Sequence, residues 1–171
     1  MLTASIAATS ADGISWTQRT LPVSGNWLSI TFGNGVFVAI AYDSNVAVTS
    51  SDGITWTART LPSSSWASVT YGNGVFVVIS KFFSDAAATS PDGITWTART
   101  LPSTGYWNSV TYGNGVFVAV AGFSSSAATS PDGITWTSRS LTSTEAWYSI
   151  CFGNTLFVTS AGGSSTKAAV H

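Results

Sequence analysis

Charged side chains are scarce in this 171-residue chain: they make up 8% of it, and the formal net charge is −1. The six cationic residues are scattered, which excludes a nucleic-acid partner because binding to phosphates requires clustered Lys and Arg. Apolar runs are short as well, and none, including residues 36–41, approaches the length that crosses a bilayer. The first residues lack a basic segment followed by a long apolar one. We therefore expect no Sec-type signal peptide and no membrane insertion.

Residues that usually carry chemistry are equally few. The chain has one cysteine, Cys151, which excludes an intrachain disulfide framework, one glutamate, Glu145, and one histidine, His171. No two groups offer the distinct environments that general acid and base catalysis needs, and no spacing of His, Cys and Asp suggests a metal site. We predict no catalytic residues, no metal and no cofactor, and we expect that the protein is not an enzyme.

What the chain does contain is a repeat of about 40 residues. The hexapeptide at residues 12–17 returns almost unchanged at residues 52–57, 92–97 and 132–137, with a spacing of 40 each time. A fixed period of this length indicates that one supersecondary unit is stacked or arranged in a circle. The repeat also separates positions that stay fixed and serve the scaffold from positions that differ and are free to carry function.

Each repeat predicts four short strands, which we name A, B, C and D. In the third copy they are residues 107–112, 116–121, 127–130 and 134–139, segments rich in residues that favour strands. Gly113-Asn114-Gly115 joins A to B and is a strong hairpin signal, because Asn and Gly accept positive φ. No segment has the 3.6-residue period of a helix. The predicted fold class is all-β, a small β-propeller with four blades of four antiparallel strands.

The two ends of the chain each supply part of a repeat. Residues 5–9 and 14–19 match strands C and D, and residues 147–152, 156–161 and 167–170 match A, B and C. We predict a single domain, 1–171, whose ring closes through a blade made from residues 1–20 and 147–171, since mixed closure removes the open edges of the sheet. The last segment is then a surplus C strand. The alternative is an arc that a second copy completes into a larger ring.

The recurring segment at residues 50–56 resembles the Asp box, or bacterial neuraminidase repeat. That motif marks the C–D turn of propeller blades in sialidases, in secreted glycosidases and lectins, and in photosystem assembly factor-like proteins. Asp52 and Gly53 are adjacent here, whereas the usual motif has one residue between them, so this is a shortened variant. The repeats also look like those of phage tail-fibre and other virion-associated proteins. Such a resemblance implies a fold more strongly than a function, because the host folds serve many activities.

Residues that recur once per blade are interpreted as structural. The aspartates are spread around the ring and cannot converge on a substrate, so we expect them to cap turns. Strand D carries one set of tryptophans, expected in the core between blades, and strand A opens with a second set, expected in the core but with some edges exposed. The arginines at the end of strand D are expected in salt links or solvated rather than in a sialidase-like clamp. These four sets are Asp12, Asp52, Asp92 and Asp132; Trp16, Trp56, Trp96 and Trp136; Trp27, Trp66, Trp107 and Trp147; Arg19, Arg59, Arg99 and Arg139. Cys151 lies where other copies have threonine, so a buried strand residue is expected.

The loops that differ between copies point to one face. In an up-and-down blade the A–B and C–D turns share one face, and these turns are nearly invariant. The B–C and D–A loops share the other face and vary freely, with aromatic residues beside polar ones. That mixture suits stacking on sugar rings or contact with a protein, although neutral drift in unconstrained loops is the alternative. The candidate ligand-binding residues are Tyr42, Asp43, Asn45, Lys81, Phe82, Phe83, Asp85, Tyr106, Phe123 and Glu145.

These observations predict a non-enzymatic recognition module that binds a glycan or a cell-surface receptor through the B–C/D–A face. The resemblance to virion proteins suggests an extracellular or virion setting. The alternative is a structural or assembly protein that docks onto another virion subunit, and a glycoside hydrolase is a weaker one. Oligomers remain possible under each of these hypotheses.

Overall fold

The computed structural model describes residues 4–62, 65–162 and 168–170, and all of its regular structure in those ranges is β-strand. No helix in them is long and apolar enough to cross a membrane. The thirteen strands are β1 (Ala4–Thr9), β2 (Thr17–Gly33), β3 (Val36–Tyr42), β4 (Val46–Ser50), β5 (Thr57–Thr60), β6 (Trp66–Gly72), β7 (Val75–Ser80), β8 (Ser84–Ser90), β9 (Thr97–Gly113), β10 (Val116–Ser130), β11 (Thr137–Gly153), β12 (Leu156–Gly162) and β13 (Ala168–Val170). The prediction of an all-β protein is therefore confirmed.

The strands form two antiparallel sheets that keep the order of the chain. One sheet contains β1 to β5 and the other contains β6 to β13. Each of β2, β9 and β11 has 17 residues, because strand D of one repeat continues without a break into strand A of the next. The sequence predicted loops at these junctions. Their Ser-, Thr- and Gly-rich segments instead stay extended, so strand D of one blade and strand A of the next form one uninterrupted strand.

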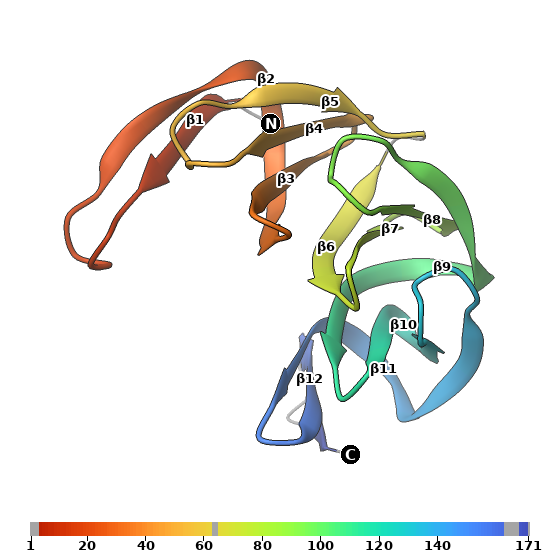
Figure 1. Ribbon diagram of the computed structural model, residues 1–171. Coiled ribbons are helices and arrows are strands. Elements are labelled where there is room, and N and C mark those ends of the chain that lie inside the picture. Colours follow the sequence, from red (N-terminus) through yellow and green to blue (C-terminus); the bar gives the residue numbers. More distant parts are fainter. Residues whose placement is uncertain (1–3, 63–64, 163–167, 171) are drawn as a thin grey trace.

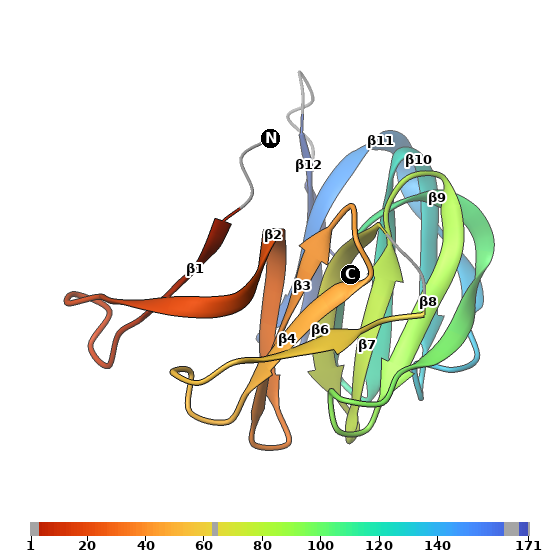
Figure 2. The same cartoon turned by 90° about the horizontal axis from the view of Figure 1, so that it is seen from above.

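In the view of Figure 1, successive strands follow an open arc. The β1–β2 hairpin projects from one end of the arc, and β12 lies at the other end (Figures 1 and 2). The predicted closure of the ring within one chain is not found among the described residues. β1 pairs with β2, and β12 pairs with β11 and β13. β13 occupies the C-strand place on β12 that β1 was predicted to take, and β1 lies at the other end of the arc (Figure 1).

The hydrophobic core consists of clusters that lie between successive blades. One joins Val38 and Ile40 of β3 to Trp66 and Phe76 of the next blade, and an equivalent cluster lies one repeat further on. The B strands of the first two complete copies are buried on both faces, as the sequence predicted: Val38, Ile40, Val77 and Ile79 have no exposed surface. Burial then falls along the arc, where Val118 and Val158 are half-buried and Ser160 is exposed. The same kind of contact between neighbouring blades therefore recurs three times along the arc.

The tryptophans reverse the expected order of burial. Those that open strand A are the better buried, since Trp66, Trp107 and Trp147 have no exposed surface. In the strand D set, Trp56 and Trp136 are buried and Trp96 is half-buried, but Trp16 is 62% exposed. The prediction of a core position for Trp16 is wrong because no blade precedes it in the arc.

Candidate functional site

The C–D turns are held by an aspartate in each repeat. Asp52 Oδ1 accepts hydrogen bonds from the backbone N–H groups of Ile54 and Thr55, both at 2.8 Å, and from the Ser50 hydroxyl at 2.9 Å. These bonds favour the charged form and lower the pKa of Asp52 to about 2. Asp12, Asp92 and Asp132 make the same bonds, and their pKa values are lowered for the same reason. The carboxylates are thus used within their own turns.

The invariant turns of neighbouring blades meet on one face of the arc. The A–B turn places Asn34 at φ 47° and Gly35 at φ 75°, the geometry that an Asn-Gly hairpin provides. Asn34 Nδ2 then donates to the Pro91 carbonyl of the next blade at 3.2 Å, and Asn73 donates to Pro131 in the same way at 3.1 Å. This face is consequently fixed by contacts between blades.

The four arginines serve the scaffold through a contact that the sequence did not indicate. Arg59 Nε donates to the Thr49 hydroxyl at 3.0 Å, which joins strand D to strand C. Arg19, Arg99 and Arg139 donate in the same way to Thr9, Thr89 and Thr129. A hydrogen bond across the blade takes the place of the expected salt link, and Arg139 is in addition exposed to solvent.

The variable loops bring five aromatic residues together across three blades. The Tyr42 and Phe82 rings lie 5.2 Å apart, Phe83 and Tyr106 lie 5.7 Å apart, and Tyr106 and Phe123 lie 6.0 Å apart. These distances fall in the range of favourable aromatic pairs. We call Tyr42, Phe82, Phe83, Tyr106 and Phe123 the aromatic row. Four of its side chains are strongly exposed: Phe82 46%, Phe83 65%, Tyr106 43% and Phe123 66%.

A loop geometry that recurs in three repeats positions two of these side chains. Asp43, Phe83 and Phe123 occupy equivalent B–C positions and have φ values of 60°, 40° and 58°. The serine that follows each of them accepts a hydrogen bond from the backbone N–H two residues further on, at 3.1–3.2 Å. A bulky side chain is unusual in this left-handed region, whereas Asp tolerates it better. Phe83 and Phe123 are therefore held outward on strained backbone.

Polar side chains border the aromatic row. Lys81 Nζ lies 5.5 Å from the centre of the Tyr42 ring, within cation–π range. Partial burial, with a smaller effect of the Asp43 carboxylate, raises the pKa of Tyr42. Glu145 lies on β11 opposite Ser124, the residue that follows Phe123. A face with aromatic rings, a cation and carboxylates can stack on a flat apolar surface and bond to polar groups at its rim.

The remaining predicted ligand-binding residues are less directly involved. Asp43 and Asn45 are exposed in the first B–C loop, where the Asn45 carbonyl accepts a hydrogen bond from Leu61 N–H at 2.8 Å. Asp85 is half-buried in β8, close in sequence to Phe83. Sequence reasoning missed Ser44, Ser84 and Ser124, which brace the loops. Their recurrence at intervals of 40 was the signal that could have found them.

Two further expectations concern reactive side chains. No group of three or more His, Cys, Asp or Glu that could hold a metal ion occurs in the part of the chain that the structure describes. His171 lies outside the described residues. Cys151 is exposed, so the prediction of a buried strand residue is wrong. Its counterparts Thr31, Thr70 and Thr111 are half-buried by a following blade, which the last A strand lacks.

Comparison with known proteins shows the fold. No family model matches the chain, and no curated protein matches it in sequence. Among solved structures, virginiamycin B lyase from Staphylococcus aureus superposes with a TM-score of 0.81 at 13% identity, over 92% of this chain and 56% of the lyase. YCF48 bound to a D1 peptide gives 0.69 at 20% identity, over 99% and 58%. The computationally designed Ika4 protein gives 0.66 at 12% identity, over 86% and 91%.

These likenesses establish a β-propeller fold for the chain, which spans just over half the length of the lyase and of YCF48. They also contradict one prediction. We expected that the protein is not an enzyme. That expectation is overturned, because the same arrangement of strands is found in a lyase. Identities of 13–20% show the fold alone and assign no activity here.

Proposed function

We propose that the chain is a recognition module that binds a glycan through the aromatic row. The observation that carries this proposal is the exposure of Phe83 and Phe123 on backbone that is unfavourable for phenylalanine. Strain of this kind persists where the surrounding structure holds it and is concentrated at functional sites. Drifting loops would have no reason to keep two bulky residues there when Asp43 occupies the equivalent position in another copy.

The chemistry of the face favours sugar as the ligand. Exposed aromatic rings offer flat apolar surfaces to the C–H faces of a pyranose, while Lys81, Asp43 and Glu145 offer charged partners to its hydroxyl groups. The row crosses three blades, so an extended oligosaccharide fits it better than a single ring. A cell-surface receptor that carries such glycans, met in an extracellular or virion setting, is the partner we propose.

The proposal includes a finer description of the scaffold. We propose that the strands make up four blade-equivalents, three complete and one divided between the two ends of the arc. The shortened Asp box is proposed as the element that fixes the C–D turn in each of them. Under this description the invariant face is the scaffold and the variable face is the binding surface.

A glycan array followed by calorimetry tests the binding site. The test variant is Phe82→Ser/Phe83→Ser, and the control is Ile94→Ser/Ile134→Ser, which removes two half-exposed isoleucines from the invariant turns. Loss of two stacking rings is expected to weaken binding by about 2 kcal/mol, or roughly 30-fold in Kd, while the control binds like wild type. Equal binding by the Phe82/Phe83 variant, or no glycan bound by wild type, would refute the proposal.

A second candidate is docking onto a protein subunit through the same face. It is favoured by the likeness to YCF48, which was solved with a bound D1 peptide. Virion assembly is the setting suggested by the resemblance of the repeats. A screen of peptides against wild type and the Phe82→Ser/Phe83→Ser variant separates this candidate from the first, since only the ligand class differs.

A further inference from the structure

The arc contains one blade-to-blade contact that is repeated three times. A Cβ placed on Gly33, Gly72 or Gly113 would lie 2.0 Å from the ring of an aromatic residue on the next A strand, namely Tyr71, Tyr112 or Phe152. Beside each pair, a backbone N–H donates to a serine hydroxyl on the preceding strand: Val69 to Ser29, Val110 to Ser68 and Ile150 to Ser109, at 3.1–3.2 Å. Every blade thus presents an aromatic ring and a donor to a glycine and a serine.

The two ends of the arc carry the two halves of this contact. At the β2 end, Phe32 is 54% exposed and Ile30 is 58% exposed, although the counterparts of Ile30 are only 5–8% exposed. At the β11 end, Gly153 has no atom within 4 Å of its would-be Cβ, and Ser149 is exposed. The β2 end therefore has the aromatic ring of Phe32 and the backbone donor of Ile30. The β11 end has Gly153, with no ring packed on it, and the exposed Ser149.

A second pair of complementary features lies further out in the blades. Gly133, in a C–D turn, packs against Val77, Thr89 and Phe117 of its neighbours, and Gly93 packs against the equivalent Val38, Thr49 and Phe76. The next residues in this series are Val118, Thr129 and Phe157. They line an open apolar cavity of about 330 Å³, and no C–D turn packs on them as the turns with Gly93 and Gly133 pack on the equivalent residues. Gly13 and Trp16 form the one C–D turn, among the described residues, that has no preceding blade to pack against.

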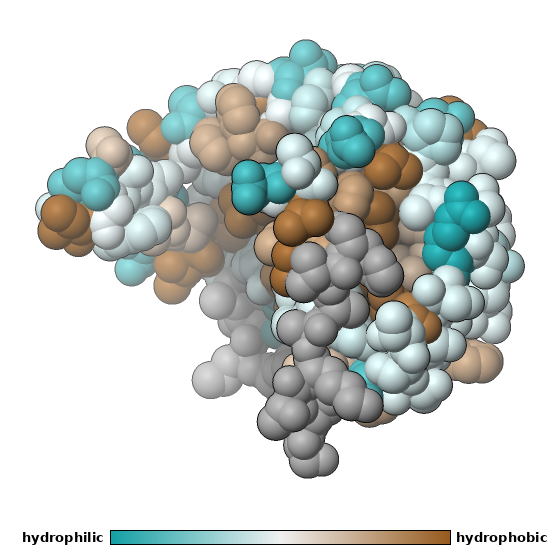
Figure 3. Space-filling model, turned by 90° about the horizontal axis from the view of Figure 1, so that it is seen from below, coloured by the Kyte–Doolittle hydropathy of each residue, from teal (hydrophilic) through white to brown (hydrophobic). Residues whose placement is uncertain are grey.

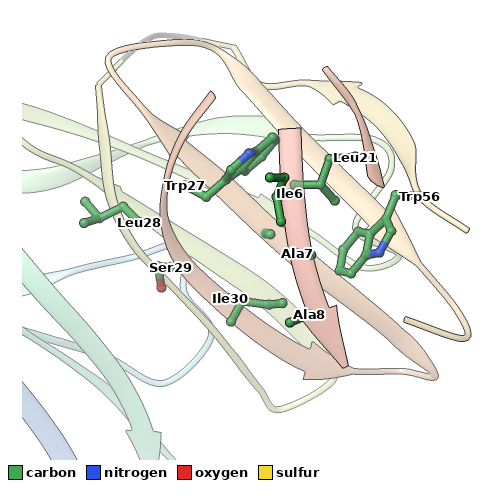
Figure 4. Close-up of a pocket in the computed structure, with 10 residues that line it drawn as sticks. Ile6, Ala7, Ala8, Leu21, Trp27, Leu28, Ser29, Ile30 and Trp56 are labelled. Carbon is green, nitrogen blue, oxygen red and sulfur yellow. The ribbon is translucent and has the colours of Figure 1, made fainter. Parts of the chain in front are cut away.

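The β1–β2 end has a matching cavity of about 280 Å³. Figure 4 shows Ile6 from β1 beside Leu21, Trp27 and Ile30 from β2, with Trp56 across from them. In complete blades the equivalent space is filled by strands A and B. Hydrophobic surface is visible on this projecting end of the arc, at the left of Figure 3. Strands A and B without a D strand are what β11 and β12 provide at the opposite end.

We propose that a second copy of the chain completes the divided blade, so that β1 and the first part of β2 from one copy join β11 and β12 from the other. Phe32 would cover the partner copy's empty glycine, and Trp16 would enter its apolar cavity. The contact is head-to-tail, and such contacts close into a ring when the rotation permits. Two copies give about eight blades, within the range known for propellers. The likeness to just over half of two longer propellers agrees with an arc of this curvature.

β13 is the element that competes with this assembly. It pairs with β12 through Val158↔Val170, Thr159↔Ala169 and Ser160↔Ala168, the same register in which C strand β8 pairs with β7. The incoming β1 takes this register, so β13 has to leave. Ala169→Pro, which removes a backbone donor from β13, is therefore expected to strengthen association.

The test is the mass of the full chain in solution, by sedimentation over a range of concentrations. Wild type is expected at twice the 17.7 kDa chain mass. Trp16→Ala and Gly153→Ala are each expected to weaken association at least about 30-fold, as loss of a buried aromatic anchor does at interfaces. Ile94→Ala, an exposed residue away from both ends, is the control. In wild type, the rate of alkylation of Cys151 is expected to fall as the dimer forms.

The structure also fixes what would overturn the inference. Trp16 and Gly153 make few contacts within the arc, so their variants are expected to keep the wild-type circular dichroism spectrum. A wild type that remains monomeric at every concentration, as a ring closed within one chain would, refutes the proposal. So does an oligomer whose dissociation constant is the same in wild type, Trp16→Ala and Gly153→Ala.

Discussion

Substitution of Gly72 by alanine tests the blade-to-blade contact most directly. The added Cβ would lie 2.0 Å from Tyr112 Cγ, 2.3 Å from Cδ1 and 2.5 Å from Cβ, where ordinary contact begins at 3.4 Å. Rotation of the ring cannot relieve the crowding, because the Tyr112 Cβ is itself too close. Strand β9 would have to move away from β6 in a close-packed interface.

The size of the effect follows from that geometry. Added methyl groups in well-packed cores cost about 1–3 kcal/mol, and the backbone shift required here places Gly72→Ala near 3 kcal/mol. For a chain of this length that is a fall in Tm of roughly 6–12 °C. Differential scanning calorimetry and urea unfolding measure it, and an overall stability of about 5–15 kcal/mol leaves the variant folded.

Gly153→Ala is the matched control, since it makes the same change at the equivalent position with no neighbour within 4 Å. Both substitutions are made in a Trp16→Ala background, which keeps self-association out of the comparison. The control is expected to unfold within about 0.5 kcal/mol of its parent. Equal destabilisation of the two variants, or a Gly72→Ala protein as stable as its parent, would show that the contact has been misassigned.

Two further predictions concern the two faces of the arc. The pKa of Asp52 is lowered to about 2 from 3.8, so its contribution to stability is complete above about pH 4 and is lost as the pH falls through 2. The stability of Asp52→Asn, measured by urea unfolding, should therefore depend less on acid pH than that of wild type. An identical pH profile for the two proteins would contradict this. Phe83→Asn and Phe123→Asn place a residue that tolerates positive φ in the strained loops, so each is expected to raise stability by up to about 1 kcal/mol while glycan binding falls, as calorimetry would show. A Phe83→Asn protein that is less stable than wild type would refute the strain argument.

The repeat made much of the fold predictable. The period of 40 residues, the Asn-Gly hairpins and the B strands, apolar at nearly every position, led to an all-β propeller, because each is a local pattern with one local solution. What could not be predicted was the fate of the ends. Residues 5–9 and 167–170 both match strand C in sequence, and nothing in those sequences signals that β13 (Ala168–Val170) is the one that pairs with β12. The burial of Trp16 and Cys151 was mispredicted for the same reason, since it depends on a neighbour rather than on the strand itself.

The candidate site shows a similar division. Variation between copies located the loops and the aromatic side chains in them, because loop residues are free of the constraints that fix the scaffold. Contacts such as Tyr42 with Phe82, or Tyr106 with Phe123, join different repeats, and no spacing within a repeat encodes them. The left-handed backbone at Phe83 was also invisible in sequence, since phenylalanine is among the residues least expected there.

The serine that follows each left-handed B–C residue has a consequence for how this surface can change. Its hydroxyl braces the loop from the C-terminal side in all three repeats, whichever side chain stands at the left-handed position. One repeat displays a carboxylate there and two display a phenyl ring, on backbones that have the same shape. Under the proposed function, a single codon change in one repeat is expected to alter the ligand preference of the face while the serine brace of the loop stays in place. The repeats can then be varied one at a time to give a panel of related specificities.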